Sequence, residues 1–99
     1  MTSFAVTYTY GAGTGSARDE VRPVHVDFLR AAFERGDLRI SGPFADSGTD
    51  GALLIWEAES EAELVQKIDQ DPFYVNGLIG HREIRQWKIV FDASQSAAA

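Results

Sequence analysis

Ala52-Leu53-Leu54-Ile55-Trp56 is an uninterrupted apolar run in the middle of the chain. A strand with one face in water alternates apolar and polar residues, whereas a strand covered on both faces is apolar throughout. Residues 44–51, which precede the run, are rich in turn-forming residues, and residues 60–63, which follow it, are typical of a helix start. The run therefore predicts a strand that is covered on both faces, and the other elements are placed outward from it.

One helix is predicted before this strand and one after it. The first covers residues 19–35, where acidic residues suit the first turn, Gly36 suits the C-terminal end, and Pro23 is tolerated only near the start. The second begins at Ser60-Glu61-Ala62-Glu63, a capping box in which the serine hydroxyl accepts a hydrogen bond from the last backbone amide. It ends before Asp71-Pro72, because the residue that precedes a proline avoids the helical conformation.

Further strands are predicted over residues 4–10, 38–41 and 83–91. The first and last of them alternate between two faces, which is the period of a β-strand. The glycine-rich residues 11–16 suggest a phosphate-binding loop, but Ser16 stands where a dinucleotide fingerprint requires glycine. We therefore interpret this segment as a flexible loop that joins the first strand to the first helix.

The predicted order is β-α-β-β-α-β, which is the plan of a ferredoxin-like α+β fold. Right-handed crossovers place both helices on one face of a four-stranded antiparallel sheet and leave the other face bare. Large apolar residues on several strands indicate that this open face is buried too, so we expect a homodimer that packs through it. Residues 1–92 are predicted to be a single domain, and residues 93–99, which are small and polar, a flexible C-terminal tail.

The composition argues against several classes of protein. The formal net charge is −6 and the basic residues are scattered, so we expect no nucleic-acid partner. The chain has no cysteine, which removes disulfides and thiolate chemistry and fits a cytoplasmic location. The N-terminus lacks a signal-peptide pattern, and no apolar run approaches the roughly 20 residues of a membrane span, so no membrane is expected as a partner.

His25 is the best-placed group for chemistry. It falls in the middle of the apolar arc of the first predicted helix, and Arg22 lies one turn earlier within the same arc. The residues alone leave two readings open: a core imidazole satisfied by one hydrogen bond, or an acid/base group paired with Asp71. Asp71 comes where the second helix breaks, and both helices share one face of the sheet. A half-buried Arg22 would need an anion, either a carboxylate or a ligand.

A metal site is not expected. His81, the other imidazole, is predicted to be solvated in a turn before the last strand. Together with His25, Asp69 and Asp71 it forms no recognisable set of ligand spacings.

Several short motifs follow one another along the chain: Arg22-Pro23-x-His25, Leu29, Ser41-Gly42-Pro43, Asp50-Gly51, Asp71-Pro72-Phe73 and Gly77-Leu78. No single motif is decisive, but in this order they resemble the YciI-like (YCII-related) family over residues 4–91. The resemblance implies a dimeric α+β barrel built from ferredoxin-like protomers. It also implies an active site around His25 and Asp71.

The same resemblance also implies a type of reaction. A related member of the family removes chloride from a chlorinated hydroxyquinol without a cofactor, with a His–Asp pair as the proposed acid/base. We therefore expect a cofactor-free lyase or isomerase that acts on a small oxygenated substrate, cyclic or chlorinated, through His25 and Asp71. Beside this pair, the residues expected to bind the substrate are Arg22, Ser41, Gly42, Pro43 and Phe73.

Two alternatives stay open. The same pocket could belong to a small-molecule-binding or regulatory module without turnover. A cofactor-free oxygenase on a similar dimeric barrel is the other alternative, although no residue pattern in the chain indicates oxygen chemistry.

Overall fold

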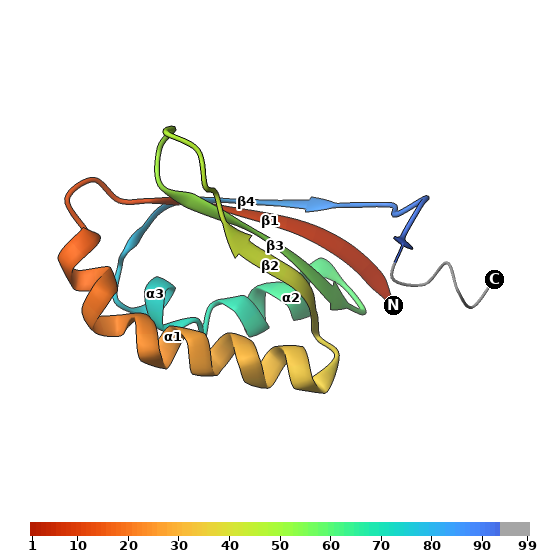
Figure 1. Ribbon diagram of the computed structural model, residues 1–99. Helices are drawn as coiled ribbons and strands as arrows, with labels where there is room; N and C mark the ends of the chain where they lie inside the picture. Colours follow the sequence, from red (N-terminus) through yellow and green to blue (C-terminus); the bar gives the residue numbers. More distant parts are fainter. Residues whose placement is uncertain (94–99) are drawn as a thin grey trace.

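The structure is a computed structural model that describes residues 1–93 of the 99-residue chain. Its helices and strands are shown in Figure 1. In chain order they are β1 (Thr2–Tyr10), α1 (Gly15–Arg35), β2 (Leu38–Pro43), β3 (Gly51–Ala58), α2 (Glu61–Ile68), α3 (Pro72–Val75) and β4 (Ile79–Gln86). The tail predicted at residues 93–99 lies outside the described residues, apart from Ala93.

The strands form one antiparallel sheet in the order β2-β3-β1-β4. α1, α2 and α3 lie against one face of this sheet, and no helix of the described residues covers the opposite face (Figure 1). The predicted ferredoxin-like α+β fold is therefore confirmed. The apolar run lies in β3, which is an inner strand between β2 and β1. α3 is a single turn that follows the break at Asp71-Pro72.

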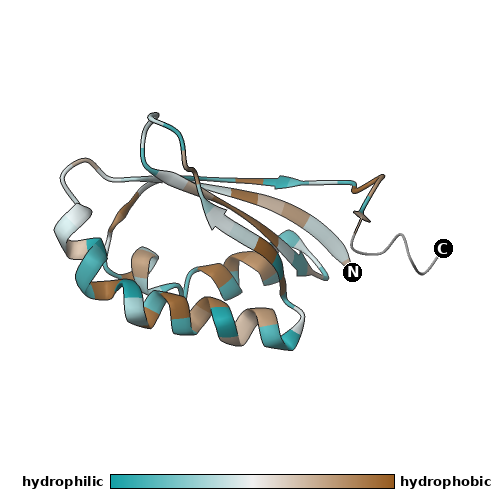
Figure 2. Ribbon diagram, in the orientation of Figure 1, coloured by the Kyte–Doolittle hydropathy of each residue, from teal (hydrophilic) through white to brown (hydrophobic). Residues whose placement is uncertain are grey.

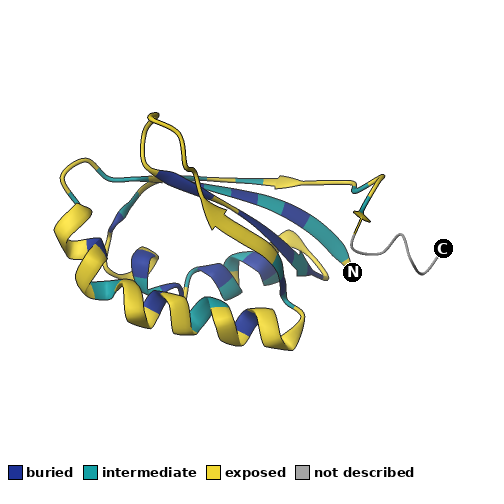
Figure 3. Cartoon of the chain, in the orientation of Figure 1, coloured by how far each residue is buried: buried dark blue, intermediate teal, exposed yellow. Residues whose placement is uncertain are grey.

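The core lies between the sheet and the helices, and Figure 3 shows that both layers contain buried residues. Phe4 pairs with Trp56 across β1 and β3, and both side chains are buried. From the helix layer, Leu64 and Ile68 of α2 are fully buried in the same cluster. Apolar burial of this kind is the main force that holds the helices on the sheet.

The start of α2 agrees with the predicted capping box. The Ser60 hydroxyl accepts a hydrogen bond from the backbone amide of Glu63 at 3.2 Å. The Glu63 carboxylate contacts the Lys67 amine, one turn later, at 2.9 Å. Both contacts favour a helix that begins at this point.

α1 begins at Gly15, before the predicted start at residue 19, so Pro23 lies inside the helix rather than near its first turn. The glycine-rich loop is correspondingly shorter than predicted. The backbone amide of Arg18 bonds to the Thr14 carbonyl at 2.8 Å, and its Nε atom donates to the Thr14 hydroxyl at 3.0 Å. These contacts support an additional turn although Pro23 removes one helical hydrogen bond. The helix ends as predicted at Gly36, which has a left-handed φ of 85°.

The last strand is shifted from its predicted position. β4 spans Ile79–Gln86, whereas the alternation predicted a strand over residues 83–91. β4 is an edge strand that pairs with β1, and the pairing ends where the Trp87 amide bonds to the Ser3 carbonyl at 2.9 Å. The residues after Trp87 lie beyond the start of β1, so they have no β1 residues opposite them to pair with. His81 therefore lies in β4 rather than in a turn, and it is exposed as predicted.

The open face of the sheet is less apolar than the sequence predicted. β3 is largely apolar, whereas the end of β4 is polar (Figure 2). By register, β1 and β4 turn small or polar side chains to this face: Ser3, Ala5, Thr7, Thr9, His81, Glu83 and Arg85. Its exposed apolar side chains come from β2 and β3, where Ile40 is 67 % exposed and Leu53 39 % exposed. The prediction of large apolar residues across the whole face is therefore wrong for β1 and β4.

Candidate active site

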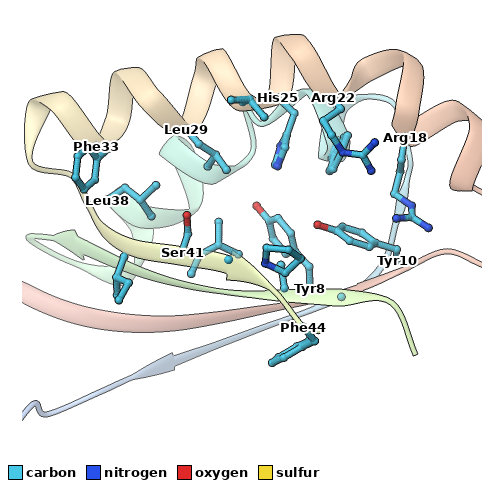
Figure 4. A pocket seen from close by; sticks show the side chains of 18 of the residues that line it. Tyr8, Tyr10, Arg18, Arg22, His25, Leu29, Phe33, Leu38, Ser41 and Phe44 are labelled. Atoms are coloured by element: carbon cyan, nitrogen blue, oxygen red, sulfur yellow. The ribbon is translucent and has the colours of Figure 1, made fainter. Parts of the chain in front are cut away.

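A cavity of about 750 Å³ lies between α1 and the strands β1, β2 and β3. Figure 4 shows how the side chains of α1 and of the strands point toward one another across it. We call it the α1 cavity, and its walls include Tyr8, Tyr10, His25, Leu38 and Ser41. All of the predicted site residues except Asp71 line it. Its size is sufficient for a small organic molecule.

His25 and Asp71 meet at the wall of the α1 cavity. The Nδ1 atom of His25 lies 2.7 Å from the Oδ1 atom of Asp71. Asp71 is the N-cap of α3 and Pro72 is the first residue of that helix, an order that favours a helix start. The local sequence therefore fixes the carboxylate in place. Asp71 is 0 % exposed and His25 is 7 % exposed, so water hardly competes for their contact.

Two further donors hold the Asp71 carboxylate. The Tyr8 hydroxyl donates to Oδ2 at 2.9 Å, and the backbone amide of Phe73 donates to Oδ1 at 2.9 Å. Because a carboxylate only accepts, the Nδ1 atom of His25 is the donor in the third contact. In the neutral ring the lone pair then lies on Nε2, an atom that has no hydrogen-bond partner among the described residues.

Phe73 fixes the plane of the imidazole. Its ring is stacked on the His25 ring, with the centroids 3.8 Å apart and an angle of 6° between the planes. The Tyr10 ring meets Phe73 at 5.6 Å and 87°, which is an edge-to-face contact. Together with the bond to Asp71, these contacts set the orientation of the His25 ring without a ligand.

The two tyrosines of the cavity have raised pKa values. Burial, followed by the charge of Asp71 and the hydrogen bond to it, raises the pKa of Tyr8 far above its usual range. Burial and the Asp71 charge also raise the pKa of Tyr10, although the charges of Arg18 and Arg22 oppose this shift. Both phenols are therefore protonated at neutral pH and available as hydrogen-bond donors.

Most of the predicted substrate-binding residues line the cavity without touching the His–Asp pair. The Arg22 side chain is 45 % exposed, and the carboxylate that it was expected to need is that of the exposed Asp19, with which it forms an ion pair. Residues 41–43 form the exposed end of β2, on the sheet side of the cavity. Phe73 is the exception, since it stacks on His25.

Sequence reasoning missed Tyr8, Tyr10 and Arg18. The alternation of the first strand does place both tyrosines on the face that lies under the helices, so a signal for them was present. Arg18 was missed because the helix was predicted to begin one residue after it. In the structure its guanidinium lies 4.4 Å above the centre of the Tyr10 ring and 3.2 Å from the Asp50 carboxylate.

The described part of the chain contains neither a cluster of metal ligands nor a membrane-spanning helix. Within residues 1–93, no group of three histidine, cysteine, aspartate or glutamate side chains is arranged to hold a metal ion. In the same range, no helix combines the length and the apolar character needed to cross a bilayer.

The fold and the site define a class of protein: a ferredoxin-like protomer of the dimeric α+β barrel superfamily, with a cavity under its first helix. A family model described as the YCII-related domain matches residues 2–88. The chain therefore belongs to the YCII-related family, and the resemblance seen in the sequence is confirmed.

Solved structures show the same fold. 5-Chloro-2-hydroxyhydroquinone dehydrochlorinase (TftG) from Burkholderia phenoliruptrix AC1100, in complex with 2,5-dihydroxybenzoquinone, is 25 % identical, with a TM-score of 0.77 over 87 % of this chain and 93 % of that chain. An uncharacterized NIPSNAP domain protein from Burkholderia xenovorans is 16 % identical, with a TM-score of 0.55 over 94 % of this chain and 96 % of that chain. At 16 % identity the likeness shows the fold alone. The search of curated proteins found no match.

Proposed function

We propose that the protein is a cofactor-free enzyme in which His25 is the acid/base and Asp71 orients it. One observation carries this proposal. The His25 ring is held by a buried carboxylate at 2.7 Å on one side and lines a cavity of about 750 Å³. A histidine with a purely structural role has no need of such a cavity beside it.

The contact with Asp71 supports proton transfer at the Nε2 atom of His25. The carboxylate keeps the other ring proton on Nδ1, and it stabilises the imidazolium that forms when Nε2 accepts a proton. A side chain in this role contributes about 10²–10⁴-fold to a reaction rate. Phe73 keeps the ring in one plane, so the lone pair has a fixed direction.

We propose elimination of HCl from a ring-hydroxylated substrate, or a related isomerisation, as the reaction. The complex of TftG with 2,5-dihydroxybenzoquinone supports a cyclic ligand of this size. In the elimination, His25 takes the proton of a ring hydroxyl and returns it to the carbon that bears chlorine. A second hydroxyl then loses its proton while chloride leaves with the bonding pair. The substrate loses one proton and one chloride overall, so no oxidant or reductant is required.

The remaining site residues would position the ring. Arg22 is proposed to hold a substrate oxyanion, because a guanidinium offers paired donors to oxygen anions. Residues 41–43 supply a hydroxyl and backbone polar groups from the opposite wall. Phe73 supplies an apolar wall next to His25.

We also propose that two copies form a homodimer through their open sheet faces. This proposal is supported by the match to the dimeric α+β barrel superfamily and by the exposed Ile40 and Leu53 on that face. A cytoplasmic location is proposed as well, and the lack of cysteine in the chain is compatible with it.

The test is chloride release from 5-chloro-2-hydroxyhydroquinone under anaerobic conditions, which prevent oxidation of the ring by air. The wild-type protein should release chloride, and His25→Ala should lower the rate at least about 100-fold while it still binds 2,5-dihydroxybenzoquinone. Chloride release by His25→Ala at the wild-type rate would refute the acid/base role. Binding without turnover in the wild-type protein would favour a small-molecule-binding or regulatory module.

A further inference from the structure

The charged lining of the α1 cavity is opposite in sign to the chain as a whole. The chain has 15 acidic and 9 basic side chains, yet the cavity is lined by a single acidic residue, Asp50. The basic residues that line it are all arginines: Arg18, Arg22, Arg30 and Arg39. Asp71 does not reduce this excess, because it is fully buried behind His25 and is not part of the lining. The charged side chains that line the cavity are therefore mostly cationic, although each of these arginines also pairs with a carboxylate.

These arginines differ in how far the protein itself occupies them. Arg18 is buried, and it bonds to Thr14 and Asp50 while it covers the Tyr10 ring. Arg39 pairs with Asp92, and both side chains are 23 % exposed. Arg22 has a side chain that is itself 45 % exposed and pairs with the exposed Asp19, and an ion pair between two exposed side chains is weak. Arg30 forms a similar surface pair with Asp27. A ligand can displace Asp19 from Arg22 more easily than it can displace the partners of Arg18 or Arg39.

Arg22 also lies at the end of the cavity where a ligand would meet His25. Arg18 and Arg22 are one turn apart on α1, and the Arg18 guanidinium lies 4.4 Å from the centre of the Tyr10 ring (Figure 4). Burial raises the pKa of Tyr10 and these two charges oppose the shift, which agrees with their position near the phenol. Two cations therefore lie near the Tyr10 side chain.

The part of the cavity beyond His25 has the larger apolar side chains. There α1 contributes Leu29 and Phe33, and β2 contributes Leu38 (Figure 4). Leu54 of β3 adds to the same wall, which Arg30 and Arg39 also line. A ligand ring can therefore contact apolar side chains on the far side of His25 from Arg22.

We infer that the α1 cavity binds an amphipathic organic acid, with its carboxylate at Arg22 and Tyr10 and its apolar ring along Leu29 and Phe33. Arg22 would replace its bond to Asp19 with a paired bond to the carboxylate, and Arg18 would add its charge from behind. This inference deepens the proposed function, because it places the centre of an aromatic or alicyclic acid next to the Nε2 atom of His25. It specifies a carboxylate, which 5-chloro-2-hydroxyhydroquinone does not have.

Equilibrium binding of benzoate and of its neutral isostere benzamide tests the inference by calorimetry. Benzoate should bind at least about tenfold more tightly than benzamide. Arg22→Gln should lower the affinity for benzoate about tenfold, which corresponds to about 1.4 kcal/mol, and should leave that for benzamide within about twofold. Arg35→Gln is the matched control: it removes the same charge from the same helix outside the cavity, and it should change neither affinity by more than about twofold.

The variant Asp19→Asn should raise the affinity for benzoate, whereas Arg22→Gln should lower it. Asp19→Asn frees Arg22 from its surface partner, so the affinity for benzoate should rise about two- to fivefold. A variant that merely damaged the fold would not bind more tightly. Equal affinities for benzoate and benzamide, or equal losses in Arg22→Gln and Arg35→Gln, would overturn the inference, as would no benzoate binding at about 10 mM.

This experiment separates the inference from the proposed function, because it measures binding without turnover. His25→Ala should keep the preference for benzoate over benzamide even though it abolishes catalysis. Loss of the anion preference with chloride release intact would refute only the inference. Anion preference without any turnover in the wild-type protein would count against only the proposed enzyme.

Discussion

The Nδ1 atom of His25 lies 2.7 Å from the Oδ1 atom of Asp71, although 46 positions separate the two residues in the chain. α1 brings the imidazole to the sheet, and the N-cap of α3 brings the carboxylate to the imidazole. Because both partners are buried, the Nδ1 atom of His25 depends on Asp71 for its hydrogen bond, whereas Asp71 also accepts from Tyr8 and from the Phe73 amide. The pair is therefore a structural contact as well as a proposed catalytic one, and different substitutions separate these roles.

Asp71→Ala should destabilise the fold. It would leave the Tyr8 hydroxyl, the Phe73 amide and the His25 ring without their acceptor in a buried place. An unsatisfied buried donor costs about 1–3 kcal/mol. The free energy of unfolding, measured in urea, should fall by at least that amount. Asp27→Ala, which removes a 75 % exposed carboxylate from α1, should change it by less than about 0.5 kcal/mol.

Asp71→Asn should separate catalysis from stability. The amide keeps the size of the side chain and an oxygen that can accept from Tyr8, but it removes the negative charge that stabilises an imidazolium at His25. We expect kcat for chloride release to fall about 10²–10⁴-fold, with a smaller loss of stability than in Asp71→Ala. A variant with wild-type kcat would show that the carboxylate has no part in the reaction.

The protein should lose stability above pH of about 10 because of its buried phenols. The pKa values of Tyr8 and Tyr10 are raised in the folded protein, whereas in the unfolded chain a phenol has a pKa of about 10. Above that pH the unfolded chain has released protons that the folded protein retains, so the free energy of unfolding falls as the pH rises. Tyr8, which is 1 % exposed, should contribute a slope of up to about 1.4 kcal/mol per pH unit.

Tyr8→Phe should remove most of this alkaline slope. At neutral pH the same variant should be about 1–2 kcal/mol less stable than the wild-type protein, because Asp71 loses one donor. Tyr74→Phe is the control, since that ring is 41 % exposed and lies under Arg82. Urea unfolding at several pH values measures both effects. An unchanged slope in Tyr8→Phe would mean that another group titrates in this range.

Phe73 should act as a positioning residue for His25. Phe73→Leu keeps an apolar side chain but removes the flat surface that stacks on the imidazole at 3.8 Å. The ring would then adopt more orientations, so kcat should fall about tenfold while KM changes little. Phe33→Leu is a matched control, because Phe33 lines the opposite end of the cavity. That variant should change KM and leave kcat near the wild-type value; the reverse pattern would contradict the positioning role.

Local signals in the sequence predicted the order of the helices and strands well. They predicted less well where α1 begins and where β4 ends. The run in β3, the Ser60 cap and the order of elements are local features, and the structure contains all three. The start of α1 involves Arg18, which contacts the nearby Thr14 but also Asp50, a residue that only the fold brings to it. The end of β4 depends on where β1 ends, which its own alternation cannot reveal.

The site likewise contains residues that the sequence predicted and residues that it did not. The sequence alone marked His25 and Asp71, and the structure places them in contact. The part of the cavity lined by Tyr10 and Arg18 was not predicted, because these two side chains come into contact only when α1 lies over β1. Arg22 was predicted to need an anion, but the pattern could not show that a weak surface partner, Asp19, already supplies one.

The proposed dimer can be tested through Leu53. This side chain is 39 % exposed on the open face of β3, near the exposed Ile40 of β2. If two copies pack through these faces, the wild-type protein should have a mass of twice 10.9 kDa by light scattering at micromolar concentration. Leu53→Glu would place a charge from each copy in the interface, so the mass should fall to 10.9 kDa. Val24→Glu, which changes an exposed residue of α1, should leave the dimer intact. A monomeric wild-type protein, or equal masses for Leu53→Glu and Val24→Glu, would contradict an interface on the open face.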